Sequence, residues 1–340
     1  LFYLVPQGSD TVGFKTSTPL RTGVERDYYW NNNDYRVIQP STRRLNVFEQ
    51  LDYDLTDRVS LFADLSAYLA WSRTYREPES VTNSTDGDVV VPSTNPWNPF
   101  GTRFWDPNGA PNADGTQRLR GTPSPVLLNN KRLLDLPERT ADITSSVYRA
   151  VVGLRGTLSG SWSWESAVLY SRAAVTDDES NAVRKSLFQE ALNRTDSTAY
   201  NPFGYTFAVR NGQLVVDAPT QSAPAVESAF LQPFIRQGIT KLGSVDFRAS
   251  GDVFSLWRGN AVAAAVGGEF REEGYDDYRP PYAGLNPADS GLDPTGNDFL
   301  SFSPNADTHA NRHLTSIYGE TVVPLVNERM HVPLVRSFEL

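Results

Sequence analysis

The stretch "VSLFADLSAYLAW", residues 59–71, decides the fold. Its even positions are mixed and polar, whereas its odd positions are the apolar Val59, Leu61, Ala63, Leu65, Ala67, Leu69 and Trp71. Because side chains alternate between the two faces of a strand, this period of two predicts a strand with one apolar face and one wetter face. The stretches 148–158 and 245–253 repeat the pattern, and the sequence therefore predicts an all-β protein.

Connections between the predicted strands alternate between short and long. Tight turns are expected at 56–58, 159–161, 258–260 and 327–329, and long connections at about 74–141, 177–240 and 277–312. In an antiparallel meander this alternation puts every long loop at one end, as in membrane barrels with short periplasmic turns and long extracellular loops. The strands, at roughly 13–17 residues, also exceed the usual length of about 5–6 in soluble proteins. We expect an antiparallel transmembrane β-barrel segment of about eight long strands, at 43–55, 59–73, 142–158, 162–176, 241–256, 261–276, 313–326 and 330–340.

Tryptophans lie near the ends of these strands. Trp257 precedes a short turn, Trp162 and Trp164 follow one, and Trp71 lies at the far end of its strand. Aromatic girdles at the two membrane interfaces have this distribution, so these four residues are predicted membrane-interface aromatics. The alternative is that they are core tryptophans of a soluble β-domain.

Composition excludes several functions. The 340 residues carry a net charge of −9 and no cluster of Lys and Arg, so no nucleic-acid partner is expected. Cysteine is absent, which excludes disulfides, thiolate metal sites and cysteine nucleophiles. The longest apolar run, "AVAAAV" at 261–266, is too short for a membrane helix.

Several stretches resemble the barrel of TonB-dependent outer-membrane receptors. The most specific is "GSVDFRASGDVFSLWRGNAVAAAVGGEFREEGYDD" (243–277), and "YRAVVGLRGTLSGSWSWESAVLYSRA" (148–173) is similar to a barrel hairpin. "AVRKSLFQEALNRTDSTAYNPFG" (182–204) resembles a segment before a long loop in a proteobacterial branch of the family. "SIYGETVVPLV" (316–326) and "RSFEL" (336–340) complete a resemblance that begins at about residue 43.

This resemblance implies part of an active importer in the Gram-negative outer membrane. Such barrels have about 22 strands, and in this family they enclose an N-terminal plug. The plug and the last strands have no counterpart here, so 1–340 is expected to be a partial barrel domain. The implied partners are outer-membrane lipid, the chain's own plug domain, the TonB complex through that plug, and a small solute such as siderophore-iron, cobalamin or a saccharide. No cofactor and no enzymatic activity are implied.

Two other interpretations remain open from the residues alone. The first is a passive outer-membrane porin. The second is a soluble surface module, rich in β-structure, that binds or hydrolyses a ligand. Burial of the apolar face of 59–71 under a second sheet would favour this soluble module.

The motif NPFG occurs twice, at 98–101 and 201–204. Its proline and glycine predict a turn that carries a phenyl ring. The rings are candidates for contact with a ligand in the outer loops, together with their aromatic neighbours, but packing inside the loops is favoured because large ordered loops need small cores of their own. The candidates are Trp97, Phe100, Trp105, Tyr200, Phe203 and Tyr205.

Charged residues also alternate with apolar ones, most clearly in "EFREEGYDD" at 269–277. If the Phe270 ring faces lipid, its charged neighbours face the lumen, whereas Glu272 falls on the phenyl side near the outer end. Paired carboxylates would also suit a glycosidase, but a solvated acidic face is the simpler interpretation. The lumen-facing candidates are Arg149, Arg155, Asp246, Arg248, Glu269, Arg271 and Glu273.

Three remaining stretches are interpreted as ordinary structure. "FWDPNGAPNADG" (104–115) spaces oxygen ligands but has Ala110 at a ligand position and no closing Glu, so a turn cluster rather than a calcium loop is predicted. His309 and His313 are four apart without the Glu of a zinc protease motif, so no metal site is expected. "SLFQEALNR" (186–194) predicts a short helix that packs within an outer loop.

Overall fold

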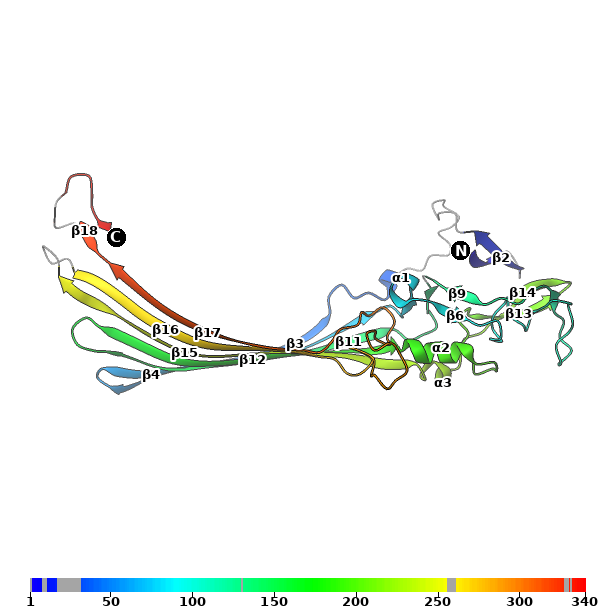
Figure 1. Ribbon diagram of the computed structural model, residues 1–340, viewed down its shortest axis with the longest axis horizontal. Coiled ribbons are helices and arrows are strands. Elements are labelled where there is room, and N and C mark those ends of the chain that lie inside the picture. Colours follow the sequence, from blue (N-terminus) through cyan, green and yellow to red (C-terminus); the bar gives the residue numbers. More distant parts are fainter. Residues whose placement is uncertain are drawn as a thin grey trace.

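A large antiparallel sheet runs along most of the elongated molecule, and a cluster of loops forms the other end (Figure 1). The structure is a computed structural model that describes residues 2–7, 11–16, 32–129, 131–255, 261–326, 330 and 332–340. The sheet curves along its length, as strands with the usual right-handed twist do. Among the described residues, no helix has the length and apolar character needed to cross a membrane.

Seven long strands form this sheet, in the spatial order β17-β16-β15-β12-β11-β4-β3. Strands that follow one another in the chain are hydrogen-bonded neighbours throughout, so the predicted antiparallel meander is confirmed. The strands are β3 (Ser41–Thr56), β4 (Val59–Arg76), β11 (Arg139–Thr157), β12 (Ser163–Val183), β15 (Leu231–Ser255), β16 (Ala261–Tyr278) and β17 (Thr308–Val322).

The prediction of an eighth long strand at 330–340 is wrong. In the described part of that segment, pairing is confined to β19 (Phe338–Glu339), which pairs with β18 (Pro324–Val326). Pro333 cannot donate to a ladder, and Leu334 has a φ of +67°, so the backbone turns instead of extending. The expected turns at 258–260 and 327–329 lie outside the described residues.

Strands β12 and β15 extend farther toward the long loops than predicted. Their ladder continues without interruption from Ser163↔Ser250 to Glu179↔Phe234, where the register shifts. The extra residues, 177–183 and 231–240, lack the alternation of apolar and polar side chains that marks the rest of each strand. An ion pair between Arg236 and Asp177, 2.9 Å apart, bridges the two strands there.

The register gives the sheet an apolar face and a charged face. One row of directly paired positions on the apolar face crosses six neighbouring strands with apolar side chains: Leu51, Ala63, Val152, Val168, Val245 and Phe270. The adjacent row on the charged face contains Asp52, Asp246 and Glu269. Within the described residues no second sheet packs on β4, since Leu65 is 43% exposed and Trp71 is 46% exposed.

Three long loops join the strands at the end of the sheet opposite the short turns. We call them the first loop (77–138), the second loop (184–230) and the third loop (279–307). The first contains β5 (Ser80–Val81), α1 (Asn83–Asp86), β6 (Val89–Val91), β7 (Trp105–Asp106), β8 (Leu119–Arg120), β9 (Val126–Leu128) and β10 (Lys131–Arg132). The second contains α2 (Lys185–Asn193), β13 (Tyr205–Arg210), β14 (Gln213–Pro219) and α3 (Pro224–Glu227).

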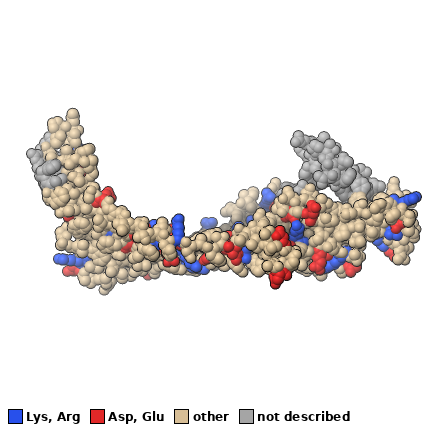
Figure 2. All heavy atoms as spheres, viewed as in Figure 1, with Lys and Arg blue, Asp and Glu red and all other residues tan. Residues whose placement is uncertain are grey.

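The N-terminal hairpin, β1 (Phe2–Gln7) and β2 (Thr11–Thr16), joins β14 and β13 in a four-stranded sheet at the loop end. A short 3-10 helix, η2 (Asn32–Asp34), follows it before β3. Figure 1 places the N-terminus beside the loops and the C-terminus at the opposite end, near the short turns. Charged side chains gather more densely over the loop cluster than over the sheet (Figure 2).

Candidate functional site

The charged face carries all the side chains that were predicted to share a lumen-facing surface. Arg155 lies in one row with Glu165 and Arg248, and Arg248 Nη2 is 2.9 Å from Glu165 Oε1. Arg271 lies 2.8 Å from Glu269 on its own strand. The register puts Arg149, Arg155, Asp246, Arg248, Glu269, Arg271 and Glu273 on this one face. Ion pairs on this face thus join charged side chains both between neighbouring strands and within one strand.

The tryptophans lie on the apolar face, near both ends of its strands. Trp164 pairs with Gly156 and Ala249 close to a short turn, and Trp162, next to Gly251, donates from Nε1 to Asp252 O at 2.9 Å. Trp71 lies toward the loop end of β4. Trp257 is outside the described residues. Glu272 pairs with Gly243 and so lies on the apolar face, near its loop end, as the alternation predicts.

The three long loops share one hydrophobic core. α2 begins one residue before the predicted helix and buries Phe188, Ala191 and Leu192 completely, so its predicted packing role is confirmed. Val89 and Leu133 of the first loop and Leu300 of the third loop are also fully buried in this cluster. The loops therefore form one packed unit rather than three independent flexible segments.

Tyr200, a predicted ligand-contact residue, is a core residue of this unit. Its ring packs edge-to-face on Phe188 and Phe230, with centroids 5.1 and 5.3 Å away. Its hydroxyl donates to Asp135 Oδ1 at 2.8 Å, and burial raises the pKa of both groups. With no exposed surface, Tyr200 cannot contact a solute in this conformation.

Asparagine is the residue that shapes the NPFG turns. Asn98 is fully buried, accepts a bond from Phe100 N at 2.9 Å and donates to Pro92 O and Ser124 O at 3.0 Å. Asn201 likewise accepts from Phe203 N at 3.1 Å. Gly204 has a φ of +75°, which glycine adopts without strain, whereas Gly101 has no positive φ. A Cβ there would lie 2.4 Å from Ser93 O, so close packing is the reason for glycine.

The remaining aromatic candidates are partly buried and mostly bound to the loops themselves. Trp97 Nε1 donates to Ala199 O and Trp105 Nε1 donates to Pro99 O, both at 2.8 Å. Phe203 packs against the shared core, whereas Tyr205 is 37% exposed. This geometry agrees with the favoured prediction that the rings pack the loops.

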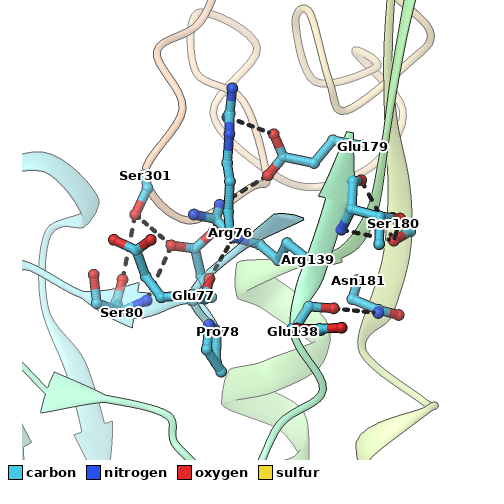
Figure 3. Close-up of polar contacts among 12 residues, drawn as sticks. Arg76, Glu77, Pro78, Ser80, Glu138, Arg139, Glu179, Ser180, Asn181 and Ser301 are labelled. Carbon is cyan, nitrogen blue, oxygen red and sulfur yellow. Dashed lines mark hydrogen bonds and ion pairs between the residues drawn. The ribbon is translucent and has the colours of Figure 1, made fainter. Parts of the chain in front are cut away.

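A buried group of charged residues lies where the sheet enters the loop cluster (Figure 3). Arg139 Nη1 lies 2.6 Å from Glu79 Oε2 and 2.9 Å from Glu179 Oε1, and its Nε donates to Glu77 O at 3.1 Å. Glu79 also accepts a bond from Ser301 Oγ at 2.7 Å, which ties the first loop to the third. Burial raises the pKa of Glu79, although Arg139 opposes this shift.

This buried network could not have been found from the sequence. Arg139 lies 60 positions after Glu79 and 40 positions before Glu179, in no motif, and only the folding of the chain brings these side chains together. By contrast, the turn predicted at 104–115 is present. Asp106 Oδ1 accepts from Asn108 N at 2.9 Å and Ala110 N at 3.0 Å, and Asp114 pairs with Arg103 at 2.6 Å.

In the part of the chain that the structure describes, no three His, Asp or Glu side chains lie in an arrangement that could hold a metal ion. His309 Nδ1 lies 2.9 Å from Asp276 Oδ1, and the His313 ring stacks near Phe270.

Comparison with protein-family models and with curated proteins finds no match to this chain.

Proposed function

We propose that the chain is part of the wall of a transmembrane β-barrel in the Gram-negative outer membrane, of the TonB-dependent receptor type. Its outer loops would bind a small solute, and its charged face would line the lumen beside a plug domain that contacts the TonB complex. The observation that carries this proposal is the exposed apolar face of the sheet, which has tryptophans near both ends, together with the larger number of charged side chains on the opposite face.

The dimensions of the apolar face support a membrane span. From Val59 to Trp71 the strand rises roughly 40 Å at about 3.3 Å per residue. A barrel tilt of about 40° projects this length to about 30 Å, which matches the hydrocarbon thickness of a bilayer. The row from Leu51 to Phe270 lies within this band and would contact lipid.

The edges of the sheet also support a larger barrel. Among the described strands, β3 and β17 each have a partner on one side only, and every residue of both strands is exposed. Long exposed edges invite pairing with further strands, and closure into a barrel removes them. No catalysis is proposed, because the charged groups on the sheet are engaged largely in ion pairs with one another.

The test uses the absence of cysteine from the chain. Leu65→Cys and Asp64→Cys place single thiols on opposite faces of β4, and each is labelled with a polarity-sensitive fluorophore after refolding into phosphatidylcholine vesicles. The Leu65 label is expected to emit at shorter wavelength and to be quenched by brominated lipid, whereas the Asp64 label is expected to be quenched by aqueous iodide. Equal access of iodide to both labels would overturn the proposal.

A further inference from the structure

Two cations interrupt the apolar face of the sheet. Arg172 of β12 and Lys241 of β15 lie on this face and occupy directly paired positions. Side chains in such positions are close neighbours, and two like charges there repel each other. In the proposed barrel this face contacts lipid, where a charged side chain is destabilising unless it lies near the membrane interface. The pair therefore needs both an anion and a place near that interface.

The protein supplies a counter-ion to only one of these cations. Lys241 Nζ lies 3.2 Å from Asp276 Oδ2, yet the Lys241 side chain is still 51% exposed. In the described ladder no acidic residue occupies a position next to Arg172 on this face. Its neighbours there are Tyr148, Tyr170, Ala174 and Lys241. The charge of Arg172 is therefore balanced best by an anion from outside the protein.

The short turns indicate how the plane of the membrane would cross the strands. The row of paired positions that starts at Val59, the first residue of β4, reaches Ala249 on β15. β15 continues from there to Ser255, which is 255 − 249 = 6 residues farther toward its turn. Strands that tilt in a barrel are staggered in this way, so the membrane boundary also shifts by about six residues between β4 and β15.

This shift puts Lys241 at the outer boundary of the membrane. Trp71 marks that boundary on β4, and its row of paired positions reaches Gln237 on β15. A shift of about six residues toward the short turn moves the boundary on β15 to Gly243. Lys241 therefore lies just outside the hydrocarbon, at the level of the lipid head groups.

Arg172 lies slightly deeper than Lys241. On β12 the row of Val59 reaches Trp164, one residue from the start of the strand, and the row of Trp71 reaches Thr176. The boundary on β12 is thus near Val175, and Arg172 lies 175 − 172 = 3 residues inside it. In a tilted strand this is a depth of about 8 Å, from which a long arginine side chain extends to the interface.

A shallow groove of about 270 Å³ adjoins Arg172 on the same face. It is lined by Tyr148 and Tyr170, which are 46% and 52% exposed, and by the small Ala150. Tyr148 pairs directly with Arg172, so the groove and the cation are neighbours. The carboxylate of Glu49, which also lines the groove, is on β3, three strands away from Arg172. An apolar groove that ends beside cations fits a lipid chain with its anionic head group.

We propose that Arg172 and Lys241 bind the phosphate group of an anionic lipid, whose acyl chain lies along the groove between Tyr148 and Tyr170. The proposal rests on the proposed function, because a lipid reaches this site only if the apolar face contacts the membrane. A phosphate accepts hydrogen bonds from both cations, and the guanidinium fork suits it in particular. The phosphate also relieves the repulsion within the pair. A choline head group would add a third cation, so an anionic lipid is favoured over a zwitterionic one.

The test compares two lipids by the quenching of a fluorophore. The chain has no cysteine, so Gly243→Cys supplies a single thiol beside Lys241, where a new Cβ meets no atom within 4 Å. The labelled chain is refolded into phosphatidylcholine vesicles that contain phosphatidic acid, with bromine on the upper acyl chain of one lipid or of the other. At equal mole fraction, brominated phosphatidic acid is expected to quench roughly threefold more than brominated phosphatidylcholine.

Substitutions identify the groups responsible for this preference. Arg172→Gln combined with Lys241→Gln is expected to remove it, whereas Arg172→Lys, which keeps the charge, should retain most of it. Arg149→Gln is the matched control, because it removes the same charge from the residue next to Tyr148 but on the charged face. It should leave the preference unchanged. Glycerol 3-phosphate has the phosphate without an acyl chain and should not reduce the quenching.

Three results would overturn the lipid site. They are equal quenching by the two lipids, an unchanged preference in the double variant, and displacement of phosphatidic acid by glycerol 3-phosphate. If the Leu65 label enters lipid and the two lipids quench the Gly243 label equally, the site fails and the barrel wall stands. If neither lipid quenches the Gly243 label and the Leu65 label stays in water, the barrel wall fails and the lipid site fails with it.

Discussion

Arg139 Nη1 lies 2.6 Å from Glu79 Oε2, and both side chains are buried where β11 enters the loop cluster. Removing one partner of a buried ion pair leaves the other charge without compensation, which costs about 3–5 kcal/mol. Arg139→Met is therefore expected to lower the free energy of unfolding of the loop cluster by that amount, as measured by urea titration followed by hydrogen exchange in the loops.

The control for this substitution is Arg103→Met, which breaks the exposed pair with Asp114. Exposed pairs contribute about 0–1 kcal/mol, so this variant should unfold close to the wild type. Equal decreases in the free energy of unfolding of the two variants would show that burial of the Arg139 network does not stabilise the place where β11 enters the loop cluster.

The loop cluster should become less stable as the pH rises toward neutrality. Burial, assisted by the charge of Asp135, raises the pKa of Glu227 from 4.5 to about 7. Between these values the folded protein binds more protons than the unfolded chain, so stability is greatest at low pH in this window and falls as the pH rises through it. Burial raises the pKa of Glu79 and Asp135 too, which acts in the same direction.

Melting temperatures of the loop cluster at pH 5 and pH 7.5 would measure this effect, with Glu227→Gln as the comparison. The variant should show a smaller decrease, because the group no longer titrates. The pKa of Glu77, lowered to about 2 by Arg36, changes stability only below its ordinary value of 4.5 and so does not interfere. A wild-type melting temperature that rises between the two pH values would contradict the prediction.

Gly153 on the charged face allows the Phe62 ring to approach the backbone of β11 closely. A Cβ at this position would lie 2.4 Å from the Phe62 ring and 2.6 Å from Ser166 O, a backbone atom that cannot swing aside. Gly153→Ala is expected to cost about 1–3 kcal/mol, the usual range for overpacking. In Gly243→Ala the new Cβ has no atom within 4 Å, so this variant should lose little stability. Comparing the unfolding midpoints of the two variants measures the difference.

Asn98 should contribute more to the stability of the first loop than the phenyl ring of the same NPFG turn, Phe100. Asn98→Ala leaves the carbonyl groups of Pro92 and Ser124 without their donor and is expected to cost about 1–3 kcal/mol. Asn108→Ala, in an exposed turn, is the control. Limited proteolysis of the first loop measures this difference. We expect the first loop to be cleaved more slowly in Phe100→Ala than in Asn98→Ala.

The strand pattern was predictable because it is local. A period of two identifies which face each residue of β4 occupies, and every lumen-facing candidate came from that period. The pattern failed at 330–340, where Pro333 interrupts the backbone, and it ended too early at β12 and β15, whose outer residues do not alternate.

The loop core could not be predicted for a different reason. Leu133, Phe188 and Leu300 come from three separate loops, and none belongs to a periodic stretch long enough to mark more than a short helix. Their contacts exist only after β11, β12 and β15 have aligned the loops at one end. The buried Arg139 network depends on the same alignment, so sequence alone did not indicate it.

The shared core of the three loops has an evolutionary consequence. Loops that pack separately can be replaced, lengthened or diversified one at a time, whereas a change at Leu133 or Leu300 here alters the surroundings of Phe188 in another loop. Variation in the three loops is therefore constrained to compensating sets of substitutions. Moving any one of these loops into another protein would require the other two to be moved with it.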